Sequence, residues 1–181
     1  LVADRLAKSE DPTVRQLAPR LERTIDRAAG LAASTLKYGR ADEQPPSLQP
    51  VNVFDAVEEA VAEALIPFGG VAYRLDVEPE LVCIADPDQL HRVFVNLIRN
   101  AGQAMTEHTR KDKLLLVRAA NIERRCEIEV VDRGPGVRAE LRGRIFDPFV
   151  SAAPEAGGAG LGLAIARELT RAMGGELELT R

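Results

Sequence analysis

One stretch of the sequence, residues 130 to 175, limits the possible folds more than any other. It begins with two apolar residues, continues with a single acid, Asp132, and then enters a turn rich in glycine and proline. A second glycine-rich run leads into a segment, Leu161 to Met173, whose pattern predicts a helix. Glycine lets the backbone approach an anion closely, and the first amides of a helix have no partner within it. Together these features are typical of a nucleotide site.

Composition argues against several other classes of protein. The chain has 181 residues and a formal net charge of −4, and it carries no basic stripe, so neither nucleic acid nor an anionic membrane is expected as its main partner. No apolar run approaches the length of a bilayer span, although a longer parent protein is still free to be membrane-bound. Cys83 and Cys126 lie in apolar, strand-like surroundings without a CxxC partner, so we expect reduced thiols and a cytoplasmic location. With His91 and His108 as the only histidines, there is no zinc-type spacing.

The first forty residues are predicted to be helical. From Thr13 to Tyr38 apolar residues recur at near-heptad spacing, and Gly39 follows as a helix C-cap. Because such narrow stripes need partners, we expect residues 1–40 to form a helical hairpin that dimerises as a four-helix bundle. An arm packed on its own domain is the alternative. Residues 41–50 contain three prolines and are interpreted as a linker to a domain of residues 51–181.

The domain after the linker is predicted to mix strands and helices. Strands are expected near Val51 and at Val71–Val77, Leu81–Ala85, Leu114–Ala120, Glu127–Val131 and Glu176–Thr180, and helices at Phe54–Leu65, Asp86–Met105 and Leu161–Met173. Because strands and helices do not alternate strictly, we predict an α+β two-layer sandwich with a mixed sheet packed on helices.

The helix expected from Asp86 to Met105 combines an apolar face with two asparagines. The apolar face, which we expect to lie on the sheet, consists of Leu90, Val93, Phe94, Leu97, Ile98 and Ala101. Asn96 and Asn100 are four residues apart, so they lie side by side next to that face. Their side-chain oxygens suit Mg²⁺, which would also hold nucleotide phosphates. A polar pair on a solvated edge is the other interpretation, and the glycine turns downstream favour the metal.

Four motifs in order extend this interpretation. NLIRNAGQA, VVDRGPGV, IFDPF and GGAGLGLAIA resemble the N, G1, F and G2 boxes of sensor histidine kinases, which belong to the gyrase, Hsp90, histidine kinase and MutL ATPase superfamily. The resemblance covers Val51 to the end, and the helical hairpin is similar to the dimerisation and histidine-phosphotransfer domain of those kinases. It implies a protein-histidine kinase that binds ATP and Mg²⁺. Such an enzyme moves the γ-phosphoryl group to a histidine and then to an aspartate of a response regulator receiver domain.

The resemblance also implies roles for individual residues. Asp132 would accept a hydrogen bond from the adenine amino group, and Asn96 and Asn100 would bind Mg²⁺ and the triphosphate. The residues implied at the nucleotide are Asn96, Asn100, Asp132, Gly134, Gly136, Val137, Phe149, Gly158, Gly160, Leu161 and Gly162. Residues 151–159 would form a lid over it. For Phe146 and Phe149, packing in the core is an equally good interpretation.

The acceptor histidine of the family is missing from the helical segment. No histidine lies between Leu1 and Gly39, so we expect the acceptor upstream of Leu1. His91 is interpreted as a surface or sheet-packing residue, and His108 has no motif around it. We therefore expect this chain to bind nucleotide without phosphorylating itself.

Charge near the phosphates also departs from the family pattern. Related kinases carry a cation in the lid and another just after the second asparagine, where this chain has uncharged residues such as Gln103. Arg142 and Arg144 are the candidates for phosphate contacts, along with Arg99. Two alternatives to a histidine kinase stay open: a phosphotransfer or binding module of the same fold without nucleotide turnover, and an anti-sigma-type serine kinase. A water-hydrolysing ATPase is disfavoured, because the amide of Asn96 cannot act as a general base.

Overall fold

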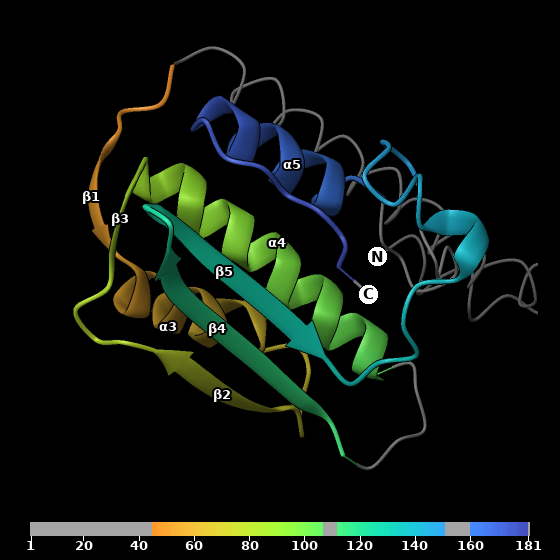
Figure 1. The fold of residues 1–181 in the computed structure, drawn as a ribbon. Coiled ribbons are helices and arrows are strands. Elements are labelled where there is room, and N and C mark those ends of the chain that lie inside the picture. Colours follow the sequence, from red (N-terminus) through yellow and green to blue (C-terminus); the bar gives the residue numbers. More distant parts are fainter. Residues whose placement is uncertain (1–44, 107–111, 151–159, 181) are drawn as a thin grey trace, which may run out of the picture.

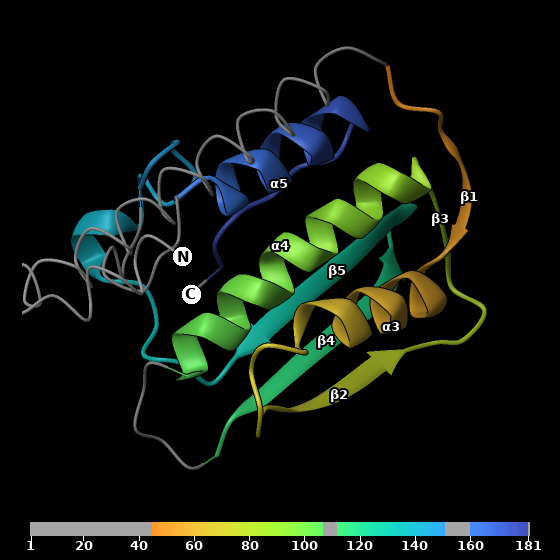
Figure 2. The same cartoon turned by 180° about the vertical axis from the view of Figure 1, so that it is seen from behind.

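The computed structural model describes residues 45–106, 112–150 and 160–180. Helices α3 (Val53–Ala64) and α4 (Pro87–Thr106) lie on one face of a three-stranded sheet, and α5 (Gly162–Ala172) packs along α4 (Figures 1 and 2). This layered arrangement confirms the predicted α+β class. The predicted helical hairpin of residues 1–40 and its dimeric bundle lie outside the described residues.

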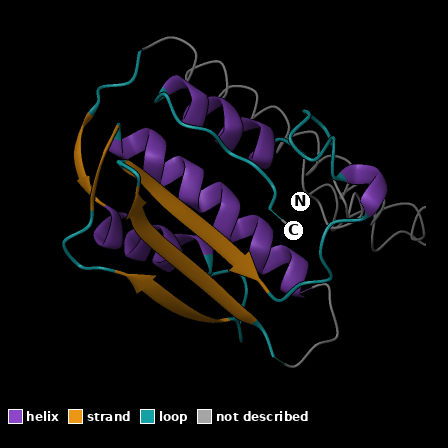
Figure 3. Cartoon of the chain, in the orientation of Figure 1, coloured by secondary structure: helices purple, strands orange, loops and turns teal. Residues whose placement is uncertain are grey.

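The larger sheet is mixed, as predicted. Its strands are β2 (Ala72–Val77), β4 (Leu114–Ile122) and β5 (Arg125–Asp132), in the order β2-β4-β5. β2 runs parallel to β4, whereas β4 and β5 are antiparallel. Two further strands, β1 (Gln49–Asn52) and β3 (Val82–Ala85), pair with each other in a separate antiparallel ribbon (Figure 3).

The turn between β4 and β5 is tighter than the sequence indicates. Ile122 pairs with Arg125, so only Glu123 and Arg124 connect the two strands. Both residues have positive φ, 47° and 69°, as a two-residue hairpin of this type requires. Since glycine or asparagine usually occupies such positions, the Glu-Arg pair gave no turn signal, and the strands were predicted too short.

Helix α4 begins where the sequence predicts it. Asp86 Oδ1 accepts a hydrogen bond from the Gln89 amide at 3.0 Å, and Pro87 occupies the first helical position. Farther along, Gly102 faces Phe68 so closely that a Cβ would lie 2.6 Å from Phe68 Cδ2. The glycine in mid-helix therefore lets the turn after α3 pack against α4. Even this longest of the described helices is not long and apolar enough to cross a membrane, and neither are the others.

The apolar face of α4 serves two neighbours, not one. Leu90, Phe94 and Ile98 are buried with residues of α3 and the sheet, whereas Val93 is buried with Ile165 and other residues of α5. The prediction that all of these residues lie on the sheet was therefore wrong for part of the face. Successive helical residues turn by about 100°, so a stripe of this width is broad enough for two partners.

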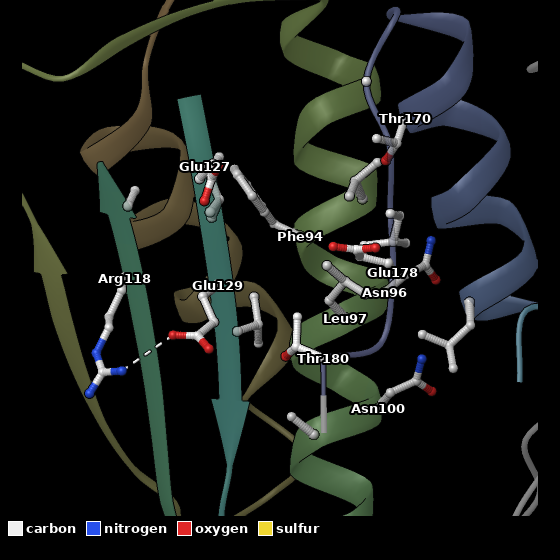
Figure 4. A pocket seen from close by; sticks show the side chains of 18 of the residues that line it. Phe94, Asn96, Leu97, Asn100, Arg118, Glu127, Glu129, Thr170, Glu178 and Thr180 are labelled. Atoms are coloured by element: carbon white, nitrogen blue, oxygen red, sulfur yellow. Dashed lines mark hydrogen bonds and ion pairs between the residues drawn. The ribbon is translucent and has the colours of Figure 1, made fainter. Parts of the chain in front are cut away.

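The strand predicted at Glu176–Thr180 does not form. Residues 175–180 lie beside α4 as a loop without regular structure (Figures 3 and 4). Leu177 packs against the buried residues between α4 and α5 instead. The alternation of Glu and Leu indicated which side chains would be buried, but a strand also needs a partner edge for its backbone, and the pattern carries no information about that.

Candidate nucleotide-binding site

The first part of the site is the turn that follows β5. Asp132 ends the strand, and its Oδ1 accepts a hydrogen bond from the Gly134 amide at 2.7 Å. A Cβ on Gly134 would lie 2.6 Å from that oxygen and 3.2 Å from Ala104 Cβ, so the turn needs glycine to pack against the end of α4. Gly136 has a φ of +75°, a backbone conformation that favours glycine. Asp132 is exposed, and its Oδ2 has no hydrogen-bond partner among the described residues.

The second part consists of the two asparagines of α4. Asn96 Nδ2 donates to the Arg92 carbonyl oxygen at 2.9 Å, which fixes the amide group. A Cβ on Gly162 would lie 3.3 Å from Asn96 Oδ1 and 3.5 Å from Asn100 Nδ2, so both side chains reach the start of α5. Figure 4 shows them pointing toward α5, whereas Phe94 points the other way, toward β5. Asn100 Nδ2 is buried and has no hydrogen-bond partner in the described part of the chain.

The third part is the start of α5. No side chain of the described residues caps this helix, and its first turn is closed by the backbone bond from Ile165 N to Leu161 O at 2.9 Å. The preceding amides therefore lack helical partners, and the helix dipole places partial positive charge among them. Together with the donor Asn100 Nδ2, these amides make an environment that favours an anion such as phosphate.

A backbone hydrogen bond joins the two ends of the predicted lid. Phe149 N donates to Gly160 O at 2.9 Å, across residues 151–159, which lie outside the described part of the chain. Phe149 has a φ of +67° and is 65% exposed, so the interpretation of this residue as core was wrong. Phe146 is half-buried, and the Arg167 guanidinium lies 5.4 Å from its ring centre.

One open cleft brings most of the predicted residues together. Of the set named from the sequence, its lining includes Asn96, Asn100, Asp132, Gly136, Val137, Gly160, Leu161 and Gly162. Gly134 and Phe149 lie next to the cleft but do not line it, and Gly158 lies outside the described residues. Ala104, Pro135 and Leu163 also line the cleft. Sequence reasoning missed them because such side chains offer no hydrogen-bonding or charged group, although Pro135 and Leu163 are next to named residues and Ala104 is one helical turn after Asn100.

The donor set of the cleft fits a magnesium ion shared with phosphates better than an ion held by protein alone. No group of three or more histidine, cysteine or acidic side chains is placed to hold a metal anywhere in the described ranges. Asn96 and Asn100 offer amide oxygens, and Mg²⁺ commonly takes one or two protein oxygens, phosphate oxygens and water. The residues present therefore fit that ion.

Two of the basic candidates, Arg142 and Arg144, and the histidine His91 are engaged elsewhere. Arg142 Nε donates to the Val137 carbonyl oxygen at 3.2 Å, and Arg144 pairs with Asp147 at 3.4 Å. His91 Nε2 lies 2.9 Å from Glu63 Oε2 of α3, so this partly buried histidine connects the two helices. His108 lies outside the described residues.

Comparison with known proteins shows which protein family has this fold and cleft. Residues 85–181 match the model of the histidine kinase-, DNA gyrase B- and HSP90-like ATPase family, and the chain belongs to that family. Among its relatives is the sensory histidine kinase/phosphatase NtrB of Rhodobacter capsulatus, 34% identical over 70% of this chain and 38% of the relative. Another is the probable sensor histidine kinase TcrY of Mycobacterium tuberculosis, 29% identical over 94% of this chain and 37% of the relative. The chain thus spans less than two fifths of the length of these relatives.

Comparison with solved structures also finds sensor histidine kinases. Full-length ShkA in complex with AMPPNP has a TM-score of 0.67 and 29% identity, over 96% of this chain and 37% of that one. The mycobacterial sensor histidine kinase MprB shares the fold, with a TM-score of 0.61 and 24% identity over 70% of this chain and 80% of that one. The chain therefore contains the catalytic ATP-binding domain typical of sensor histidine kinases.

Proposed function

We propose that this chain is the ATP-binding catalytic portion of a two-component sensor histidine kinase. The observation that carries the proposal is the convergence of Asn96 and Asn100 on the uncapped first turn of α5, in the same cleft as Asp132. The intact enzyme transfers the γ-phosphoryl group of Mg-ATP to a histidine and then to an aspartate of a response regulator. The relatives, which are named sensor histidine kinases, support this assignment.

At the base end of the cleft, Asp132 selects adenine. Its Oδ1 is already bonded to the Gly134 amide, so Oδ2 is the atom that accepts a hydrogen bond from the adenine amino group. A carboxylate only accepts hydrogen bonds, so a base with a carbonyl at this place is rejected.

At the phosphate end, Asn100 acts in two ways. Its buried Nδ2 donates to a phosphate oxygen and thereby gains the partner that the described residues do not provide. Its Oδ1 and that of Asn96 would hold Mg²⁺, which would neutralise part of the phosphate charge. The first amides of α5 bind the same phosphates from the other side.

The acceptor of the phosphoryl group is a histidine outside the cleft. Asn96 cannot take a proton from water, which favours transfer to an imidazole over hydrolysis. In the transfer, the bond between the γ-phosphorus and the ADP oxygen breaks, and a phosphorus–nitrogen bond to the imidazole forms. His91 is not that acceptor, because its Nε2 is held by Glu63 of α3 and its Nδ1 is buried.

The proposed function also assigns roles to the segments before the catalytic domain and names its partners. Residues 1–40 form the helical hairpin through which two chains dimerise, and residues 41–50 link it to the catalytic domain of residues 51–181. The receiver domain of the response regulator is the second partner. The use of ATP places this part of the protein in the cytosol, whether or not the parent protein is membrane-bound.

Titration calorimetry with Mg-ATP and Mg-ADP tests the site. Asp132→Asn and Asn100→Ala are each expected to weaken binding about tenfold or more, because each removes a hydrogen bond that involves a charged partner. Asp55→Asn, which makes the same chemical change on the exposed start of α3, is the matched control and should bind like the wild type. Unchanged affinity in both site variants would show that the site is wrong.

Labelling with ATP that is radioactive at the γ-phosphate tests the acceptor. The chain is expected to gain no acid-labile label by itself. Label on His91 or His108 would contradict the assignment of the acceptor without affecting the nucleotide site.

A further inference from the structure

The cleft has little positive charge at the end where the phosphates are proposed to bind. Residues 151–159, with the sequence SAAPEAGGA, contain one acid and no base. Gln103, one turn after Arg99 on α4, is neutral. The terminal phosphates of ATP carry more negative charge than one Mg²⁺ neutralises, and phosphoryl transfer depends on compensating that charge. Another cation of this chain is therefore needed near Asn96 and Asn100.

Two arginines near the F box are poorly placed for that role. Arg142 and Arg144 are not among the residues that line the cleft. Arg142 lines a smaller cavity with Phe146 and Arg167, and its Nε donates to the Val137 carbonyl oxygen. Arg144 pairs with Asp147, three residues away in its own turn.

Most arginines that line the cleft lie away from its phosphate end. Arg118 is on the sheet and pairs with Glu129 and Asp76, at 3.3 and 3.8 Å (Figure 4). Arg124 and Arg125 are at the turn between β4 and β5, and Arg138 follows the glycine turn after Asp132, at the end of the cleft where the base is proposed to bind. Arg171 pairs with Glu168 in the last turns of α5, far along the helix from its start.

Arg99 is the exception. It lines the cleft, follows Asn96 by three residues and directly precedes Asn100. Residues three apart on a helix have Cβ atoms about 5–6 Å apart, a gap that the long arginine side chain readily spans. Arg99 is exposed, and no ion pair joins it to another residue of the described ranges. Its guanidinium is thus available for a ligand held by the two asparagines.

We propose that Arg99 is the phosphate-binding cation of this chain and that it contacts the terminal phosphates of the nucleotide held by Asn96 and Asn100. The inference rests on the proposed nucleotide site. The planar guanidinium offers paired N–H donors that match phosphate oxygens, and it keeps its charge at any physiological pH. Arg99 is on the same helix as the two asparagines, so α4 fixes its backbone position beside them.

The test compares nucleotides that differ only in their number of phosphates. In calorimetry with Mg²⁺, Arg99→Ala should weaken ATP binding about tenfold or more, ADP binding less, and AMP binding very little. Arg99→Lys keeps the charge and loses the paired donors, so it should restore part of the ATP affinity. Raising the salt concentration should reduce the difference between the wild type and Arg99→Ala, because salt screens an exposed charge.

Three further variants distinguish a role of Arg99 from a general effect of net charge and from a role of another arginine. Arg74→Ala removes an exposed arginine from β2 and controls for the change in net charge, so it should bind ATP like the wild type. If the loss specific to ATP appears in Arg142→Ala or Arg144→Ala and not in Arg99→Ala, the inference is wrong and the nucleotide site stands. If Arg99→Ala weakens AMP binding as much as ATP binding, the effect is structural and the inference also fails. If the wild-type chain binds none of the three nucleotides, the proposed function falls and the inference falls with it.

Discussion

Two buried clusters hold the domain together, and they differ in size and in what they support. The larger cluster joins α3, α4 and the sheet, and its members include Val53, Ile98 and Leu115, each fully buried. The smaller cluster joins α5 to α4 through a few residues, among them Val93 and Ile165. The larger cluster supports β5, where Asp132 is proposed to bind the base, whereas the smaller one supports the helix start that is proposed to bind phosphate. The proposed base site therefore rests on the larger cluster and the proposed phosphate site on the smaller one, and we expect the smaller cluster to be the less stable of the two.

The largest effect is expected from a cavity in the larger cluster. Ile98→Ala should lower the free energy of unfolding by about 2–5 kcal/mol, because Ile98 is 0% exposed and its neighbours cannot close the space completely. Urea denaturation followed by circular dichroism measures the change. The fraction that remains folded should bind ATP with nearly normal affinity, since the substitution lies on the side of α4 away from α5.

The same substitution in the smaller cluster provides the matched variant. Ile165 is 6% exposed, and Ile165→Ala should lower the free energy of unfolding by about 2 kcal/mol, less than Ile98→Ala does. It should nevertheless weaken ATP binding more than Ile98→Ala does. The reason is that a loosened α5 moves its first amides away from Asn96 and Asn100. If stability and ATP affinity fell in the same proportion in both variants, the contrast between the two clusters would be unsupported.

A smaller effect is expected at Gly160, where the two ends of the predicted lid meet. Gly160 has a φ of +68°, and a Cβ there would lie 2.7 Å from the backbone carbon of Phe149. Gly160→Ala should therefore strain or break the bond from Phe149 N to Gly160 O, at a cost of about 1–2 kcal/mol, and lower ATP affinity several-fold. Calorimetry and thermal melting measure the two quantities.

Gly143 is a suitable control for that experiment. It lies in the same region of the chain, and a Cβ there would meet nothing within 4 Å. Gly143→Ala should change neither the melting temperature nor the ATP affinity appreciably. Equal behaviour of the two alanine variants would mean that the junction at Gly160 has no part in binding.

Much of the fold and of the cleft was predictable because the relevant signals are local. The cap at Asp86, the proline after it and the apolar spacing of α4 fixed that helix with little help from the rest of the chain. The four motifs placed Asn96, Asn100 and Asp132 in one site, and the cleft brings all three together. Whether these residues bind nucleotide stays a prediction until it is measured.

The features that sequence reasoning missed depend on contacts between distant segments. Residues 176–180 have the alternation of a strand, but the sequence does not say which edge they would pair with. The close contact of Gly102 with Phe68 depends on how the turn after α3 meets α4. The unpaired Asn100 Nδ2 becomes evident only when α5 covers it. In each case the missing information is the identity of the neighbour.

The smallest expected effect concerns two cysteines that connect the two sheets. Cys83 of β3 and Cys126 of β5 are both free, and each thiol influences the pKa of the other. Burial, with the neighbouring Cys126, raises the pKa of the Cys83 thiol from 9.0 to about 11, and burial also raises the pKa of Cys126. A raised pKa in the folded state means that the unfolded chain loses the proton first as the pH increases. The stabilising contribution of Cys83 is therefore complete below pH 9.0 and is lost as the pH rises through about 11.

Urea denaturation at a series of pH values across that window measures this contribution. The wild type should lose stability with rising pH more steeply than Cys83→Ala, because the variant lacks the thiol that titrates. Other groups, such as tyrosine and lysine, also titrate there, so the difference between the two proteins is the informative quantity. The difference should be modest, because Cys83 is only half-buried and solvent screens the charge of its thiolate. If the free energy of unfolding fell equally steeply with pH in the two proteins, ionisation of Cys83 would have no effect on the stability of the larger cluster.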